Sequence, residues 1–441
     1  MKPTPLSKPV IPLRQVRAGA SIPAGAPAVD RRWRVAMLVQ APHRFGFFLA
    51  VLVLGFAAGW WALVQLDRVG FGPGLAYALS PTVVHAAVMS LGFMPLFFAG
   101  FLFTAGPKWL GVAPPPARAM WWPLSLQAAG WLVWVVGGHV SAGLAYAGAA
   151  CAWIGMLITQ MLFWRLLRQS QASDQLHARV VGVAGLVGCA SLAVMLLALV
   201  LGAYPVARAA VFTGLWGFVV VTYVAVAHRM IPFFTSSAMP MVQAWRPFWL
   251  LGVLLAAAVF EALAAWGEVA GWPSTRGWML ARGLLELAAG SVILWVAFAW
   301  GLVQSLRQRL LAMLHLGFVW FGLAFVLAGL SQLLGLRTGV PVLGLGALHA
   351  LTMGFLGSLI LAMVTRVSCG HSGRALVADQ LVWTLFWLLQ AATVLRIVAD
   401  LPVAPAGSLA LAAVLFAVVV LVWGARLANW YGRARADGRP G

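Results

Sequence analysis

Long apolar runs separated by short polar segments cover most of the chain. About 20 largely apolar residues are needed for a helix to cross a bilayer, and twelve segments meet that requirement. We place them at 44–66, 81–104, 121–138, 142–167, 179–202, 207–235, 247–267, 277–303, 312–335, 341–365, 380–399 and 406–428. Because the connecting segments are short, we predict an all-α transmembrane domain of twelve helices over residues 41–430, with no soluble module.

The two ends of the chain are basic and polar. Residues 1–40 are rich in Pro and basic side chains and contain no apolar core before Val35. We therefore expect no cleavable signal peptide but a disordered cytoplasmic tail, with affinity for anionic membrane lipid. Residues 431–441 predict a second, short cytoplasmic tail.

Basic residues lie unevenly between the two sets of loops. Of the 29 Lys and Arg residues, 23 fall on the side of the N-terminus and 6 on the opposite side. Loops rich in Lys and Arg stay in the cytoplasm. We therefore predict that both termini are cytoplasmic, as an even number of spans requires.

Composition supports a polytopic membrane protein. Hydrophobic residues make up 63% of the chain and charged residues 9%, whereas soluble domains have roughly 45–50% and about 25%. The net charge of +20 does not indicate a nucleic-acid partner, because the basic residues lie between apolar runs and not on one polar face. The three cysteines lack zinc-type spacing and predict no disulfide framework. Walker, GxSxG and HExxH motifs are absent from the sequence.

Two histidines lie inside apolar spans in the same local pattern. His85 and Met89 in the second span, and His349 and Met353 in the tenth, each form His-Ala-x-x-Met near the predicted outer end. Residues four apart share a helix face, and imidazole and thioether groups both ligate haem iron or copper. The alternative is that they are polar helix contacts with Met filling gaps.

The second, sixth and tenth spans also share a Gly-Phe pair at similar positions. The pairs are Gly92-Phe93, Gly217-Phe218 and Gly354-Phe355. This repeat predicts three units of four helices around a pseudo-threefold axis, with these three spans facing one another.

A second polar cluster follows at the inner ends of the sixth and tenth spans. It contains His228, Arg229, Arg366, Cys369, His371 and Arg374. The three arginines are candidates for binding an anion in fork geometry, although basic inner loops are also ordinary topology signals. We expect His43, His139, His177 and His315, at span ends or in loops, to be solvated.

The three glutamates, Glu261, Glu268 and Glu286, belong to the seventh and eighth spans or their connection, with Arg282 one turn before Glu286. An Arg282–Glu286 pair is the cheapest way to keep both charges in a membrane. Glu261 either meets Arg282 across the hairpin or is neutral, and a proton path is the functional alternative.

At these residues the sequence resembles the NnrS family of bacterial membrane proteins. The tenth span is similar to that family's HALT…TRVSLGHTGR signature, and residues 229–235 are similar to its RVIPFFT motif. The second span contributes His85, Met89, Gly92-Phe93, Gly100-Phe101 and Pro107-Lys108-Trp109. Many relatives have HAHExxxG there. This chain has Ala87 and Val88 in place of the second His and the Glu, which indicates a divergent branch.

The resemblance implies a twelve-helix protein of the bacterial inner membrane that is associated with haem and copper and acts in the nitric oxide response and in denitrification. Our first hypothesis is that His85 and His349 ligate one b-type haem, with Met89 and Met353 nearby, in a protein that handles nitric oxide or accepts electrons from a donor. A haem between the second and tenth spans resembles haem–copper oxidases in architecture, but the seventh span has no histidine for their binuclear centre. A twelve-helix transporter or proton-coupled carrier without haem, with His85, His349 and Glu261 along its path, is the second hypothesis. A membrane sensor that binds a partner through its cytoplasmic loops is the third.

Overall fold

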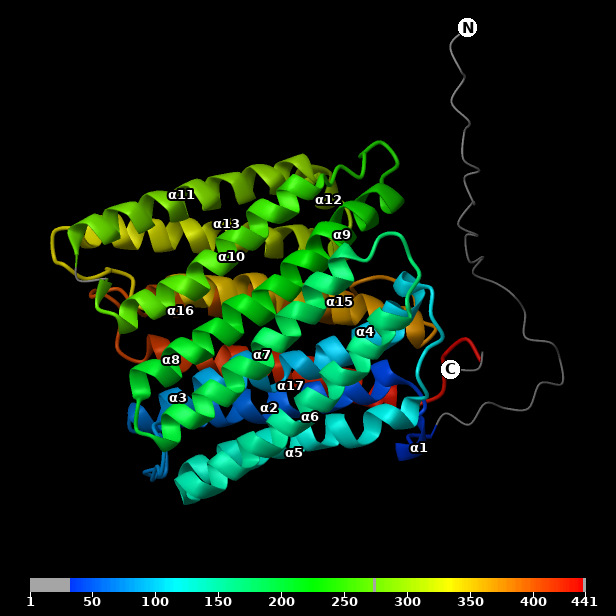
Figure 1. Cartoon of the computed structure of the whole chain (residues 1–441), viewed down its shortest axis with the longest axis horizontal. Helices are drawn as coiled ribbons and strands as arrows, with labels where there is room; N and C mark the ends of the chain where they lie inside the picture. Colours follow the sequence, from blue (N-terminus) through cyan, green and yellow to red (C-terminus); the bar gives the residue numbers. More distant parts are fainter. Residues whose placement is uncertain (1–31, 273–274, 439–441) are drawn as a thin grey trace, which may run out of the picture.

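A computed structural model describes residues 32–272 and 275–438, and nearly all of the described chain is helical. The elements in chain order are α1 (Val35–Leu38), α2 (Pro42–Arg68), α3 (Pro81–Ala87), η1 (Val88–Gly92), α4 (Met94–Leu110), η2 (Ala117–Met120), α5 (Trp121–Val140), α6 (Ala142–Gln169), α7 (Leu176–Val200), α8 (Tyr204–Thr213), η3 (Gly214–Val220), α9 (Val221–Ala238), α10 (Phe248–Val269), α11 (Arg276–Ala299), α12 (Leu302–Ser305), α13 (Arg309–Gly335), α14 (Gly346–His349), η5 (Ala350–Gly357), α15 (Ser358–His371), α16 (Gln380–Val398) and α17 (Ser408–Tyr431). The long helices lie side by side as a bundle (Figure 1).

All twelve predicted spans are helical, so the predicted all-α membrane fold is confirmed. Among the described residues, eleven helices are long and apolar enough to cross a membrane. The remaining predicted span is α5, whose Trp residues, Pro123 and Gln127 lower its mean hydropathy. It lies along α6 with Gly130 against the Gly148 carbonyl, and Gln127 donates a hydrogen bond of 2.9 Å to Thr159 of α6. We therefore count α5 as the twelfth span.

The two described ends of the chain meet on one side of the bundle (Figure 1). Near the start, the Trp33 indole donates to the Ala428 carbonyl, and Arg44 donates to the carbonyls of Tyr431 and Arg433. An even number of spans requires this arrangement, and we call this the inner side. Residues 1–31 of the predicted tail lie outside the described residues, whereas residues 32–40 include α1.

The long helices form three arcs of four. One arc is α16, α17, α2 and α4; the next is α5, α6, α7 and α9; the third is α10, α11, α13 and α15. Each arc ends on one of the second, sixth and tenth spans, and the second and sixth are the most enclosed of the membrane helices described. This agrees with the predicted arrangement of three four-helix units.

Tyr223 of the sixth span joins the three central helices. Its hydroxyl lies 3.4 Å from the Met94 sulfur in the second span and 3.4 Å from the Leu356 carbonyl in the tenth. Its ring also contacts Phe98 and Phe355. The predicted facing of these three spans is therefore observed, around a buried tyrosine.

Each central span contains a π-helical segment at its Gly-Phe pair. In the second span η1 ends at Gly92, while η3 and η5 contain Gly217-Phe218 and Gly354-Phe355. A Cβ on Gly354 would lie 2.6 Å from the Trp320 ring, so glycine is required there for close approach to α13. Segments of π-helix occur frequently at functional sites.

The tenth span is displaced relative to its predicted range. It begins at Gly346 and not at residue 341, and it continues to His371, past the predicted end at residue 365. Residues 336–345 form turns because Gly339 and Gly344 adopt positive φ. His349 therefore lies about one turn from the outer end, like His85, which lies four residues after Pro81.

Close glycine contacts hold α11 against α13. A Cβ on Gly290 would lie 2.8 Å from the Gly322 carbonyl oxygen, and a Cβ on Gly329 would lie 2.6 Å from the Gly283 carbonyl oxygen. Small residues of this kind permit backbone contact between membrane helices.

We expect Gly290→Ala to destabilise the protein by about 1–3 kcal/mol, because the added methyl must separate the two helices. Gly252→Ala is the matched control, since no atom lies within 4 Å of its added Cβ and Ala favours a helix. The thermal unfolding midpoint of detergent-purified protein measures both effects. Equal midpoints for the two variants would contradict the backbone contact.

Candidate functional site

The structure brings His85 and His349 together at the outer ends of the second and tenth spans. His85 lies on α3 and His349 is the last residue of α14. The two partly buried imidazoles are close enough to interact electrostatically. Met89 and Met353 lie about one turn further inward, in η1 and η5.

The hydrogen bonding of His349 fixes which nitrogen is available. Its Nδ1 lies 2.9 Å from the Leu345 carbonyl oxygen. A carbonyl can only accept, so Nδ1 carries a proton, and in the neutral form of the ring Nε2 presents a lone pair. A backbone carbonyl that holds the second nitrogen of an imidazole in this way is typical of metal-ligating histidines.

His85 is held by stacking. Its ring lies 3.8 Å from the Trp61 ring, centroid to centroid, with 18° between the planes. Arg68 lies over the same Trp61, 5.3 Å from its centroid. The Nδ1 of His85 is buried and has no hydrogen-bond partner among the described residues. The imidazole is therefore fixed in plane, with a polar atom that the described chain does not satisfy.

Positive charge accompanies the two histidines. Arg396 of α16 is 8% exposed and interacts electrostatically with both rings. It donates a hydrogen bond of 2.8 Å to Asp400, whose other carboxylate oxygen is buried without a partner in the described chain. The outer site thus combines two imidazoles with a buried guanidinium.

Sequence reasoning missed Trp61, Arg68, Arg396 and Asp400. They lie on α2, α16 and the segment after α16, far in sequence from either histidine. The only signal was that Arg68 and Arg396 are two of the six basic residues predicted on the outer side, where basic residues are rare.

The inner arginines face aromatic rings. Arg229 lies over Trp109 at 5.3 Å, Arg366 over Phe234 at 4.2 Å and Arg374 over Trp430 at 4.4 Å, measured to the ring centroids. Among the described residues, neither Arg229 nor Arg366 forms an ion pair or hydrogen bond. Each cation–π contact stabilises its arginine by about 0.5–2 kcal/mol. Both guanidiniums nevertheless have no anionic partner among the described residues.

Arg426 lies over the ring of Trp430, as Arg374 does. It contacts Trp430 at 4.7 Å and forms a bidentate pair with Asp379, at the N-cap of α16. The Arg426 guanidinium holds the pKa of the Asp379 carboxyl below its ordinary value. Arg374 and Arg426 therefore anchor α17 to the inner loop, a structural role.

The expectation that the inner histidines are solvated is wrong. His43, His177 and His315 are between 0% and 6% exposed. His177 Nε2 lies 3.1 Å from His228 Nδ1, and His228 Nε2 lies 3.1 Å from the Pro247 carbonyl. Membrane helices that continue beyond their predicted ends bury these rings against neighbouring helices.

His371 is also paired. Its ring lies 4.1 Å from that of His43, between centroids, at the inner ends of α15 and α2. Cys369 is 3% exposed on the same helix. Among residues 32–272 and 275–438, no three His, Cys, Asp or Glu side chains are placed to hold a metal ion.

The charges on the α10–α11 hairpin form one cluster. Arg282 lies 2.7 Å from Glu286, 2.8 Å from Glu261 and 3.3 Å from Glu268. Both the predicted Arg282–Glu286 pair and the contact across the hairpin are therefore observed. Glu268 also pairs with Arg208 of α8. One oxygen of Glu261 and one of Glu286 remain buried without a partner in the described chain.

Comparison with protein families gives one match. The family model described as NnrS protein matches residues 37–435, nearly the whole described chain. No curated protein matches the sequence.

We expect Arg282→Gln to destabilise the protein by about 3–5 kcal/mol, because it leaves carboxylates buried without a counter-charge. The triple change Arg282→Gln, Glu261→Gln and Glu286→Gln removes that charge and is expected to recover much of the loss. Arg276→Gln, at an exposed position on the same helix, serves as control. Yield of monodisperse protein and the unfolding midpoint measure the series. A triple variant no more stable than Arg282→Gln would refute the charge argument.

Proposed function

Because the chain belongs to the NnrS family, we propose that it is a haem-binding protein of the bacterial inner membrane that acts in the nitric oxide response or denitrification. His85 and His349 hold one b-type haem between the second and tenth spans. The observation that carries the proposal is the pairing of two orientated imidazoles on adjoining central helices.

The donor set suits haem iron. Axial imidazole ligands need a lone pair on one nitrogen and benefit from a fixed ring plane. Leu345 fixes the His349 tautomer, and Trp61 fixes the His85 ring. The unsatisfied His85 Nδ1 is a polar atom that a bound group would relieve.

The surrounding charge suits the two propionates of a haem. Arg396 lies near both imidazoles, and Arg68 lies beyond Trp61. Guanidinium groups bind carboxylates in fork geometry. In this proposal Arg396 and Arg68 orientate the macrocycle at the outer edge of the bundle.

When bound, the haem would supply a redox-active iron able to transfer an electron. The chain supplies the rest. The Leu345 carbonyl holds a proton on His349 Nδ1, the Trp61 face excludes water from one side of His85, and Arg396 offsets negative charge. The proposed partner is an electron donor or nitric oxide itself. Membrane lipid surrounds the helices that carry the site.

Copper, which the family resemblance implies, belongs to the same proposal. With no cluster of three His, Cys, Asp or Glu groups among the described residues, copper would compete with haem for His85 or His349, joined by the thioether of Met89 or Met353. Soft sulfur and imidazole together suit copper. Ala87 and Val88, where relatives have His and Glu, leave His85 as the only imidazole of that motif.

The orientation follows from the charge bias. With both termini in the cytoplasm, the His85–His349 site lies toward the outer face of the membrane. A haem-free carrier is the alternative, and the buried Arg282 cluster with its unsatisfied carboxylate oxygens supports it.

We expect the purified protein from haem-replete cells to show a Soret band that His85→Ala or His349→Ala reduces at least tenfold, because loss of an axial ligand weakens haem binding. His139→Ala is the control, since that outer histidine is occupied by hydrogen bonds with Trp60 and the Ala76 carbonyl. Size-exclusion profiles establish that the variants are folded. Colourless wild-type protein would refute haem binding, and substrate or proton flux in liposomes would then favour the carrier.

A further inference from the structure

The ion-pair cluster on the α10–α11 hairpin contains more acidic than basic groups. It consists of Glu261 and Glu268 on α10, Arg282 and Glu286 on α11, and Arg208 on α8. If all of these groups were ionised, two guanidiniums would face three carboxylates, and one negative charge would remain. A charge withdrawn from water costs much free energy unless it is compensated. The cluster therefore lacks one positive charge.

The excess negative charge lies at the buried end of the cluster. Glu261 is 5% exposed and Glu286 is 1% exposed, whereas the side chains of Glu268 and Arg208 are 28% and 56% exposed. Glu268 and Arg208 pair with each other at the outer end of α10. Among the described residues, this leaves Arg282 as the cation that faces both Glu261 and Glu286.

Each of the two buried carboxyl groups has one oxygen that accepts a hydrogen bond and one that does not. Arg282 Nη2 donates to Glu261 Oε2 at 2.8 Å, and Arg282 Nε donates to Glu286 Oε1 at 2.7 Å. The other two oxygens are buried without a partner in the described chain. The two carboxyl groups are also within hydrogen-bonding reach of each other. Carboxylates can only accept, so such a bond requires a proton on one of them.

We propose that Glu261 and Glu286 form a proton-binding site, in which the two carboxyl groups share one proton. Two carboxyl groups that are close together and buried do not both ionise, and the retained proton belongs to the pair. Arg282 then balances the one remaining negative charge. A proton suits the site better than a metal ion, because no three His, Cys, Asp or Glu side chains of the described chain are placed to hold a metal.

The other elements packed against the hairpin bring no further charge to the pair. α13 lies along α11 and has Arg309 and His315 in its first two turns, at the inner end of that helix. η3 packs against α10 and contains no ionisable side chain. α9 meets the start of α10, where His228 bonds to the Pro247 carbonyl at the inner side. The charges that act on the pair are therefore those of its own cluster.

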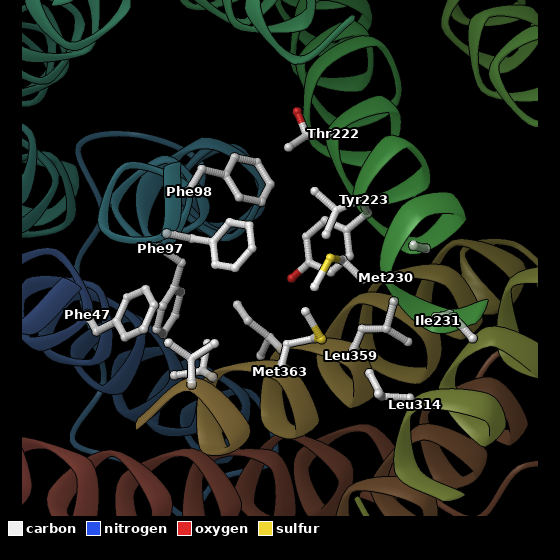
Figure 2. A pocket seen from close by; sticks show the side chains of 16 residues that line it. Phe47, Phe97, Phe98, Thr222, Tyr223, Met230, Ile231, Leu314, Leu359 and Met363 are labelled. Atoms are coloured by element: carbon white, nitrogen blue, oxygen red, sulfur yellow. The ribbon is translucent and has the colours of Figure 1, made fainter. Parts of the chain in front are cut away.

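Proton exchange with the pair is expected from the outer side and not through the centre of the bundle. An apolar cavity of about 80 Å³ lies between α4, α9 and α15. Figure 2 shows Phe97, Phe98 and Met363 on its walls, and its lining contains no carboxyl or imidazole group to relay a proton. Glu268, in contrast, is partly exposed at the outer end of α10 and lies 3.3 Å from Arg282. Glu268 and Arg282 thus connect the pair to the outer surface.

The test is infrared spectroscopy of the full-length protein in detergent at neutral pH, where an ordinary exposed carboxyl group is ionised. We expect the wild type to show the carbonyl band of a protonated carboxylic acid. Glu261→Gln and Glu286→Gln should each abolish this band, because the carboxyl group that remains is paired with Arg282 and ionises. Asp174→Asn, at an exposed carboxylate, should leave the band unchanged.

The wild type provides a second measurement that needs no variant, in case a glutamine variant elutes as an aggregate. The chain contains only three glutamates, so selective labelling of glutamate carboxyl groups with carbon-13 should shift the band. The site is built from other helices than His85 and His349 and does not rest on haem binding. The band should therefore persist in His85→Ala, whatever that variant does to the Soret band.

Four results would overturn the proposal. The first is the absence of the band from folded wild-type protein at neutral pH, and the second is a band that carbon-13 labelling of glutamate does not shift. The third is a band that survives in folded Glu261→Gln or Glu286→Gln, since the proton would then not be shared. The fourth is loss of the band when sodium replaces choline in the buffer, which would assign the two carboxylates to a metal cation.

Discussion

A polar group inside a bilayer must find a partner within the protein, and this constraint organises the whole bundle. The hairpin of α10 and α11 satisfies it with a single guanidinium that serves three carboxylates. The inner histidines satisfy it by pairing, as His177 with His228 and His315 with Thr235. Against this background the unsatisfied groups are informative. They include Nδ1 of His85 at the outer end of the bundle and one oxygen each of Glu261 and Glu286 on the hairpin. At the inner end, the guanidiniums of Arg229 and Arg366 have no anion among the described residues.

The three central helices run from the outer end of the bundle to the inner end. Tyr223 lies at the junction of the three helices, where its ring contacts Phe98 and Phe355, and Phe98 in turn contacts Phe218. Each helix adopts π geometry on the outer side of this junction and regular α geometry on its inner side. Widening of the helix in the π segment redirects the side chains that follow, so the outer halves of these helices are arranged differently from the inner halves.

The proposed haem makes a specific demand on the chain. A haem requires directed lone pairs, and the outer site offers imidazoles fixed by Leu345 and Trp61.

The sequence alone determined the twelve helices, the family and the pairing of Arg282 with Glu286, because each depends on residues near one another in the chain. Hydrophobic run length predicts a span, and i,i+4 spacing predicts an ion pair. It also identified His85 and His349, since histidines in apolar runs stand out. The ends of the tenth span were misplaced, because glycine turns before Gly346 and a polar but buried last turn are not visible in hydropathy. The tertiary structure decided which side chains surround those histidines. Trp61, Arg68 and Arg396 come from helices distant in sequence, and no local pattern links them to either ring. It also decided that Arg229 meets Trp109 of α4 and that Arg366 meets Phe234 of α9, because each contact joins helices that are distant in sequence.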